Sequence, residues 1–150
     1  MDMEIALARC EQFTAIRCYD SHIPSSRLVD CINNNQVYVL QEENKILGIL
    51  RCSLFWQTIP FLDLIYLDEA CRGQGWGRRM MEYWEAHMGA LGYSYTMLST
   101  QADETSKYFY EKLGYRRIGA FLPPEQEAEE ILYLKDIPAG SATGEKAGEQ

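Results

Sequence analysis

The sequence predicts a mixed α/β fold in which a sheet is covered by helices. Strand-like and helix-like patterns follow one another in the order strand, two helices, three strands, helix, strand, helix, two strands. A composition with 47% hydrophobic and 24% charged residues is typical of a globular chain, and no apolar run approaches the ~20 residues that span a bilayer. At 150 residues we expect one domain over residues 1–137, with no membrane partner.

Each predicted element follows from its local pattern. The predicted strands are residues 4–8, 36–41, 45–55, 61–67, 93–99, 115–121 and 130–135. The predicted helices lie near residues 12–18, 24–33, 76–91 and 103–113. Pro24 suits a first helical turn, Glu43 and Asn44 form the turn of a hairpin, Asp103 is an N-cap candidate, and Gly114 closes the last helix. Residues 138–150 carry no apolar side chain larger than Ala, so we expect a disordered tail.

The third predicted helix carries one apolar stripe. Its members recur at spacings of three and four residues and are Trp76, Met80, Trp84, Met88 and Leu91. This spacing favours a core-facing surface over a cofactor-binding one.

The most informative segment is a glycine-rich turn between the fourth predicted strand and this helix. Gly73, Gly75 and Gly77 leave the backbone without Cβ atoms, so its N–H groups can approach a ligand closely. The helix N-terminus adds unpaired N–H donors, and Arg72 and Arg78 add positive charge. The segment therefore predicts a site for a phosphorylated ligand, although a turn that only lets a strand enter a helix would look the same.

Two known phosphate-binding turns do not match this segment. A P-loop would require Lys and Ser or Thr after the last glycine, and the dinucleotide fingerprint requires the spacing G-x-G-x-x-G. The sequence Arg72-Gly-Gln-Gly-Trp-Gly instead resembles the R/Q-x-x-G-x-G/A signature of the GNAT superfamily of N-acetyltransferases.

A second segment carries the same resemblance. Residues 106–115 read Ser-Lys-Tyr-Phe-Tyr-Glu-Lys-Leu-Gly-Tyr, which is similar to the short helix that follows the glycine turn in that superfamily. The resemblance extends over about residues 4–135, and residues 64–79 and 105–115 carry its specific motifs. It implies a mostly antiparallel sheet of about seven strands with helices on both faces, splayed between the fourth and fifth strands.

The resemblance also implies acetyl-CoA as acyl donor. In the superfamily the pantetheine arm pairs with fourth-strand backbone and the diphosphate lies on the glycine turn. Carried over by position, the cofactor-binding residues are Ile65, Tyr66, Leu67, Arg72, Gly73, Gln74, Gly75, Trp76, Gly77 and Arg78. Many members have Asn where this chain has residues 101–106, Gln-Ala-Asp-Glu-Thr-Ser, so a cofactor contact there is in doubt.

Two residues are candidates for the proton transfers. Tyr110 matches the tyrosine that the family places near the thioester sulfur as general acid, although it could equally pack in the core. Asp63 is an acidic residue within an otherwise apolar strand, a pattern that often marks function, although it could lie on a solvated face. The resemblance implies that Asp63 is the base that accepts the amine proton.

The acceptor is an amine whose identity the sequence leaves open. Acidic loops favour a small cationic molecule, while a protein N-terminus, a lysine, or a non-catalytic acyl-CoA sensor are the alternatives. The candidate acceptor-binding residues are Tyr19, Asp20, His22, Trp56 and Glu125.

Charge and cysteine content exclude other functions. A net charge of −8 disfavours nucleic-acid binding, and two histidines without paired-ligand spacing disfavour a metal site. Five cysteines without a C-x-x-C pair and the lack of a signal-peptide segment favour a cytoplasmic location. Cys71 beside Arg72 could be a nucleophile with a lowered pKa, although a spectator thiol is favoured. A homodimer stays open.

Overall fold

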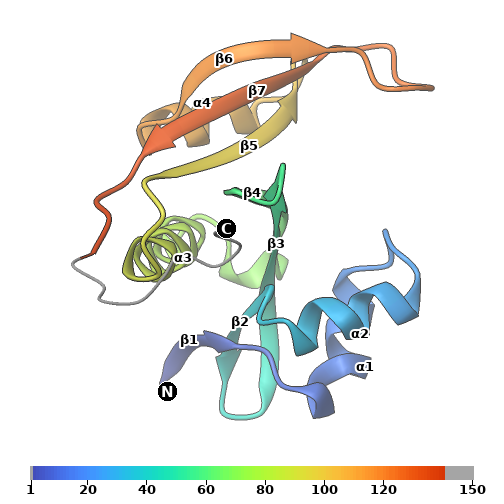
Figure 1. Ribbon diagram of the computed structural model, residues 1–150. Helices are drawn as coiled ribbons and strands as arrows, with labels where there is room; N and C mark the ends of the chain where they lie inside the picture. The colour runs from blue at the N-terminus through green and yellow to red at the C-terminus, as the bar shows by residue number, and fades with distance from the viewer. Residues whose placement is uncertain (1, 141–150) are drawn as a thin grey trace. The chain divides into compact units, whose positions relative to one another are not determined.

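A computed structural model describes residues 2–140 (Figure 1). Its strands form a mixed sheet. Its strands are β1 (Met3–Leu7), β2 (Val37–Glu42), β3 (Lys45–Phe55), β4 (Ile59–Leu67), β5 (Tyr95–Gln101), β6 (Arg116–Phe121) and β7 (Glu130–Asp136). Its helices are α1 (Phe13–Tyr19), α2 (Ser25–Asn33), α3 (Trp76–Ala90) and α4 (Ser106–Lys112), with 3-10 turns at Cys10–Gln12 and Glu69–Cys71. The predicted class and element order are confirmed.

The strand order is β1-β2-β3-β4-β5-β7-β6. The pairs β1–β2, β2–β3, β5–β7 and β6–β7 are antiparallel, while β4 and β5 are parallel. The parallel register holds only two pairs, Phe61 with Met97 and Leu62 with Leu98. Parallel strands need a crossover, and α3 supplies it between β4 and β5.

The chain divides into two compact units, and β3, β4 and α3 contribute to both. The first consists of Met1–Ser53 and Asp63–Trp84, and the second of Leu54–Leu62 and Glu85–Gln150. No helix in residues 2–140 is both long and apolar enough to cross a membrane.

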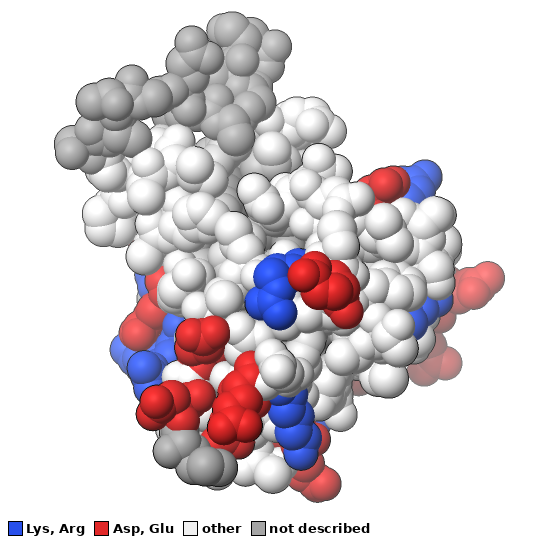
Figure 2. Space-filling model, turned by 90° about the horizontal axis from the view of Figure 1, so that it is seen from below, with Lys and Arg blue, Asp and Glu red and all other residues white. Residues whose placement is uncertain are grey.

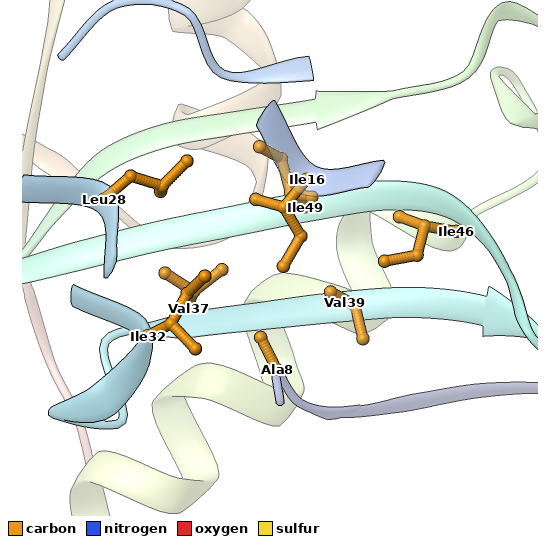
Figure 3. Close-up of a cluster of buried hydrophobic side chains, with 8 residues drawn as sticks. All are labelled: Ala8, Ile16, Leu28, Ile32, Val37, Val39, Ile46 and Ile49. Carbon is orange, nitrogen blue, oxygen red and sulfur yellow. The ribbon is translucent and has the colours of Figure 1, made fainter. Parts of the chain in front are cut away.

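In the first unit, helices cover both faces of the β2–β3 hairpin. Alternation along β2 sends Val37 and Val39 to one face, where they pack with side chains from α1, α2 and β3 (Figure 3). That cluster is Ala8, Ile16, Leu28, Ile32, Val37, Val39, Ile46 and Ile49. Tyr38 points to the other face, where its ring lies 6.0 Å from that of Tyr83 on α3.

The stripe predicted for α3 is largely buried. Met80, Trp84 and Met88 are at most 6% exposed, whereas Leu91 lies after the helix and is 37% exposed. The apolar periodicity therefore identified core positions, as expected.

The second unit contains a buried carboxylate, that of Glu85, which is hydrogen-bonded to neighbouring side chains. Glu85 on α3 accepts a hydrogen bond from the Tyr115 hydroxyl at 2.7 Å and from Lys135 Nζ at 2.8 Å. Thr96 Oγ1 lies 2.9 Å from the same hydroxyl. These contacts join the end of α3 to β5, β7 and the segment that follows α4.

The prediction that Asp103 caps the fourth helix was wrong. The N-cap is Thr105 and it makes no side-chain capping bond. Residues 101–104 form a turn instead, in which the Glu104 N–H donates to the Gln101 carbonyl at 3.1 Å, so the helix begins at Ser106. Gly114, at φ 102°, follows the helix end as predicted.

Residues 138–140 continue from β7 to the end of α3, where the Gly140 N–H donates to the Gly89 carbonyl at 2.7 Å. The remainder of the predicted tail, residues 141–150, lies outside the described residues.

Candidate functional site

The glycine-rich turn at the start of α3 carries a row of backbone N–H groups that are available to a ligand. The Gly75 carbonyl accepts the first helical hydrogen bond, from the Arg79 N–H at 3.1 Å. Within residues 2–140, none of the six N–H groups of residues 73–78 donates to a backbone acceptor. Such a row at a helix N-terminus is suited to bind phosphate.

The space over this turn is open. Gly73 and Gly75 have φ values of 74° and 89°, which side chains rarely adopt, and a Cβ added to either would meet nothing within 4 Å. The glycines therefore serve the backbone conformation and leave room for a ligand, because no packing partner would be displaced by a Cβ.

The arginines around the turn are held by local contacts. Arg72 Nε donates to the Leu67 carbonyl at 3.0 Å, and its guanidinium lies 5.1 Å from the centre of the Tyr66 ring. The Arg79 guanidinium lies 4.3 Å from the Trp76 ring centre, and Arg78 pairs with Glu82 at 3.0 Å. These side chains are exposed, so they add positive charge at the turn that a bound anion can use.

β4 leads to this turn, and its last five residues belong to the first unit. Gly48 on β3 lets β4 approach closely: a Cβ there would lie 3.1 Å from the Tyr66 carbonyl oxygen and 2.6 Å from Leu67 Cδ2. The β4–β5 ladder pairs Phe61 with Met97 and Leu62 with Leu98, which all lie in the second unit, and residues 63–67 of β4 continue the strand in the first unit. Strand backbone of this kind can pair with an extended ligand.

Two carboxylates meet at one guanidinium in the first unit. Arg51 Nε donates to Asp20 Oδ2 at 2.6 Å, and Arg51 Nη1 lies 3.7 Å from Asp63 Oδ2. The Asp20 side chain is fully buried, and the side chains of Arg51 and Asp63 are 10% and 25% exposed. His22 joins at the surface, with Nδ1 3.3 Å from Asp20 Oδ1.

The two carboxylates respond to the guanidinium differently. Burial raises the pKa of Asp20, but the Arg51 hydrogen bond and charge outweigh burial and lower that pKa overall. For Asp63, burial dominates and raises the pKa, while a hydrogen bond from Ser53 and the Arg51 charge oppose it only in part. Asp63 is therefore the stronger proton acceptor of the pair.

Tyr110 lies on α4 in the second unit and is 8% exposed. The rings of Phe109 and Tyr115 lie edge-on to it at 5.1 Å and 6.2 Å. Burial and the charge of Glu104 raise the pKa of Tyr110 to about 12, so the phenol stays protonated. Its hydroxyl makes no hydrogen bond to residues 2–140, which leaves it able to donate to a ligand.

The acceptor-binding candidates fall in both units. Tyr19 donates to the Ile46 carbonyl at 3.1 Å, and its ring centre lies 5.6 Å from that of Tyr66. Asp20 is buried against Arg51, so it cannot touch a ligand without breaking that pair. Trp56 is 79% exposed in the β3–β4 turn, and Glu125 lies in the β6–β7 loop at φ 61°.

An open hollow of about 490 Å³ also lies in the first unit. Arg27 and Asp30 on α2 line it together with Arg51. Arg51 therefore both lines this hollow and contacts the Asp63 carboxylate.

Sequence reasoning missed Arg51. The signal was present, because Arg51 interrupts an apolar strand in the same way as Asp63 does on β4. The expectation that Arg72 lowers the pKa of Cys71 was wrong: burial and the charges of Asp68 and Glu42 raise the pKa of this thiol. Within residues 2–140, no three His, Cys, Asp or Glu side chains gather in a group that could hold a metal ion.

The sequence matches the family model of the acetyltransferase (GNAT) domain over residues 33–117, more than half of the chain. The chain belongs to the GNAT family of acetyltransferases. No protein of curated function matches the sequence significantly.

Solved structures share the fold at low sequence identity. The ribosomal-protein-S18-alanine N-acetyltransferase from Escherichia coli aligns at TM-score 0.74 and 15% identity, covering 95% of this chain and 99% of that one. A phosphinothricin acetyltransferase from Sinorhizobium meliloti in complex with AcCoA aligns at 0.76 and 16%, covering 99% and 95%. A putative acetyltransferase from Salmonella typhimurium with its cofactor acetyl-CoA aligns at 0.76 and 13%, covering 96% and 99%.

Proposed function

We propose that this acetyltransferase moves an acetyl group from acetyl-CoA to the primary amine of a small cationic acceptor, by direct transfer in a ternary complex. The observation that carries the proposal is the row of N–H groups of residues 73–78, which follows β4 and donates to no backbone acceptor within residues 2–140. The row suits the diphosphate, and the β4 backbone that leads to it suits the amide-containing pantetheine arm. Two of the solved neighbours hold acetyl-CoA on the same fold.

In this proposal the cofactor residues are those of the strand and the turn. Ile65, Tyr66 and Leu67 offer backbone to the pantetheine arm, although the Leu67 carbonyl already accepts from Arg72. The turn from Arg72 to Arg78 holds the phosphates. Residues 1–137 then act as one catalytic domain.

The reaction needs a neutral amine and a stabilised leaving thiolate. The amine nitrogen attacks the thioester carbonyl carbon, the C–S bond breaks, and the amine proton passes to Asp63. The raised pKa of Asp63 strengthens it as a base. Tyr110 donates its hydroxyl hydrogen to the departing sulfur. At a pKa of about 12 it is a weak acid, so hydrogen bonding to the thiolate is the larger part of its role.

The cationic acceptor is supported by the charge of the chain. The net charge is −8, and on the face shown in Figure 2 basic side chains lie beside acidic ones rather than forming a continuous basic surface. A net negative charge attracts cationic small molecules and repels nucleic acid. Five cysteines without a disulfide fit a reducing compartment, so the proposal includes a cytoplasmic location.

Thiol release from acetyl-CoA tests the activity against polyamines, amino sugars and a lysine-containing peptide. We expect turnover with a small polycationic amine and little with the peptide. Tyr110→Phe should lower kcat about 100-fold with acetyl-CoA affinity unchanged, because the ring stays and only the donor is lost. The matched control is Tyr108→Phe, an exposed tyrosine on the same helix that should behave as wild type.

Turnover only with the peptide would replace the small acceptor by a protein. Acetyl-CoA binding without turnover of any amine would leave a sensor on this fold. A Tyr110→Phe enzyme as active as wild type would remove Tyr110 from the reaction.

A further inference from the structure

A single arginine connects the candidate base to the buried part of the first unit. Arg51 lies on β3, Asp63 on β4 and Asp20 just after α1, so three elements bring these charges together. The two contacts differ: Nε to Asp20 Oδ2 is a 2.6 Å hydrogen bond, while Nη1 to Asp63 Oδ2 is 3.7 Å.

The shorter contact identifies Asp20 as the carboxylate that holds Arg51 in place. Asp20 has no exposed side-chain surface and also accepts from the His22 backbone N–H at 3.3 Å, so it is anchored. A guanidinium is planar and offers donors in a rigid fork, so fixing its Nε edge also fixes the direction of its other nitrogens. Asp63, a quarter exposed, then faces a guanidinium that cannot turn away.

We propose that Arg51 is a positioning residue for Asp63: its guanidinium, anchored by Asp20, orients the Asp63 carboxylate toward the acceptor amine. This inference rests on the proposed role of Asp63 as base. Asp20 thus acts through Arg51, by holding its guanidinium in place, and does not bind the acceptor.

A serine hydroxyl and two cysteine thiols also lie near the Asp63 carboxylate. Ser53 on β3 donates a hydrogen bond to Asp63, and the Cys31 and Cys52 thiols lie close enough to interact electrostatically with it. Burial raises the pKa of both thiols, Cys52 to about 12, so neither is charged at neutral pH. Arg51 on β3 and Asp20 just after α1 are therefore the charged groups that act on the Asp63 carboxyl.

Two variants separate positioning from a structural role. D20N leaves the whole Arg51 charge to Asp63 and removes a neighbouring negative charge, so the Asp63 carboxyl should titrate at lower pH than in wild type. D20N/R51Q removes both charges, so Asp20 is not left as a buried carboxylate without a cation, while Asp63 loses its cation. There the Asp63 carboxyl should titrate at higher pH.

The readouts are the carbon-13 titration of the Asp63 carboxyl and the pH profile of kcat/KM. We expect the acid limb to move with the carboxyl, so that at a pH within that limb D20N/R51Q is roughly tenfold slower than D20N. R51K keeps a charge but lacks the planar fork, so its kcat should fall while its acid limb stays close to that of wild type. Lys45→Gln removes a positive charge at the exposed start of the same strand and should change neither readout.

The outcomes are distinguishable. Carboxyl titrations that stay in place, or that move in the same direction in both variants, overturn the role of Arg51 while Asp63 can still be the base. Carboxyl titrations that move as expected while the pH profile does not follow overturn the base role of Asp63, and the positioning role with it. Folding of each variant is checked by its thermal melt.

Discussion

At the scale of single residues, Asp20 illustrates how a buried carboxylate depends on its partner. Removing Arg51 leaves Asp20 charged with no cation in contact and no exposed side-chain surface. Breaking a buried pair in this way costs about 3–5 kcal/mol. We therefore expect R51A to lower the free energy of unfolding by that amount at pH 7, measured by urea denaturation.

The pH dependence of that loss follows from the sign of the shift. The pKa of Asp20 is lowered in the folded state, so its stabilisation is present above its unfolded pKa of about 3.9 and is lost as the pH falls through the folded pKa. The difference between wild type and R51A should shrink toward low pH. A difference that stays constant down to acid pH would show that lost packing, and not the ion pair, causes it.

Asp63 should behave in the opposite sense. Its folded-state pKa is raised, so its contribution is favourable below the unfolded pKa and is lost as the pH rises through the folded pKa. We expect D63N to raise the melting temperature by about 1–3 °C at neutral pH, while acetyl transfer is lost. Melting curves at pH 7 and pH 4 test this, because the gain should disappear at the lower pH.

Some residues of the candidate site could be predicted from the sequence, and others could not. Asp63 was predicted because an acidic residue is unusual within an apolar strand. Arg51 is a charged residue within an apolar strand as well, but it was overlooked. Asp20, 31 residues away from Arg51 in the chain, could not be assigned to it from spacing, because only the fold brings them together. Asp20 was therefore predicted as an acceptor contact, whereas the structure buries it against Arg51.

At the scale of elements, the close approach of β3 and β4 has a specific requirement. A Cβ at Gly48 would lie 3.1 Å from the Tyr66 carbonyl oxygen, which is backbone and cannot rotate away. We expect Gly48→Ala to cost about 1–3 kcal/mol and to weaken acetyl-CoA binding, because β4 must shift. Urea denaturation and calorimetric titration with acetyl-CoA measure the two effects.

Gly119 on β6 offers the matched control. A Cβ there would have its nearest neighbour at 4.0 Å, so Gly119→Ala should leave cofactor affinity unchanged. If Gly48→Ala binds acetyl-CoA as tightly as Gly119→Ala does, the β4 backbone beside Tyr66 does not carry the pantetheine arm.

Elements were predicted well where local pattern determines them. The hairpin turn at Glu43, with φ 55°, and the buried stripe of α3 both follow from residue types and spacing. The start of α4 did not, because the hydrogen bonds of the 101–104 turn compete with a cap at Asp103. Such competition depends on contacts that no local pattern contains.

At the scale of the whole molecule, the order of elements predicted the class, and two short motifs predicted the family. The strand order β1-β2-β3-β4-β5-β7-β6 places the last strand of the chain inside the sheet, which element order alone does not determine. The acceptor is likewise not encoded in the family motifs, since it depends on loops that differ among enzymes of one fold.

The proposed function depends on binding of the acetyl-CoA phosphates by the glycine turn. The most direct measurement is the melting temperature with acetyl-CoA, free coenzyme A and NADH. A ligand that binds only the folded chain at a hundred times its Kd stabilises it by about 2.7 kcal/mol. For a chain of 150 residues this corresponds to a rise of roughly 5–10 °C. We predict this rise with both coenzyme A species and none with NADH, whereas no rise at millimolar acetyl-CoA would show that the turn does not bind these phosphates.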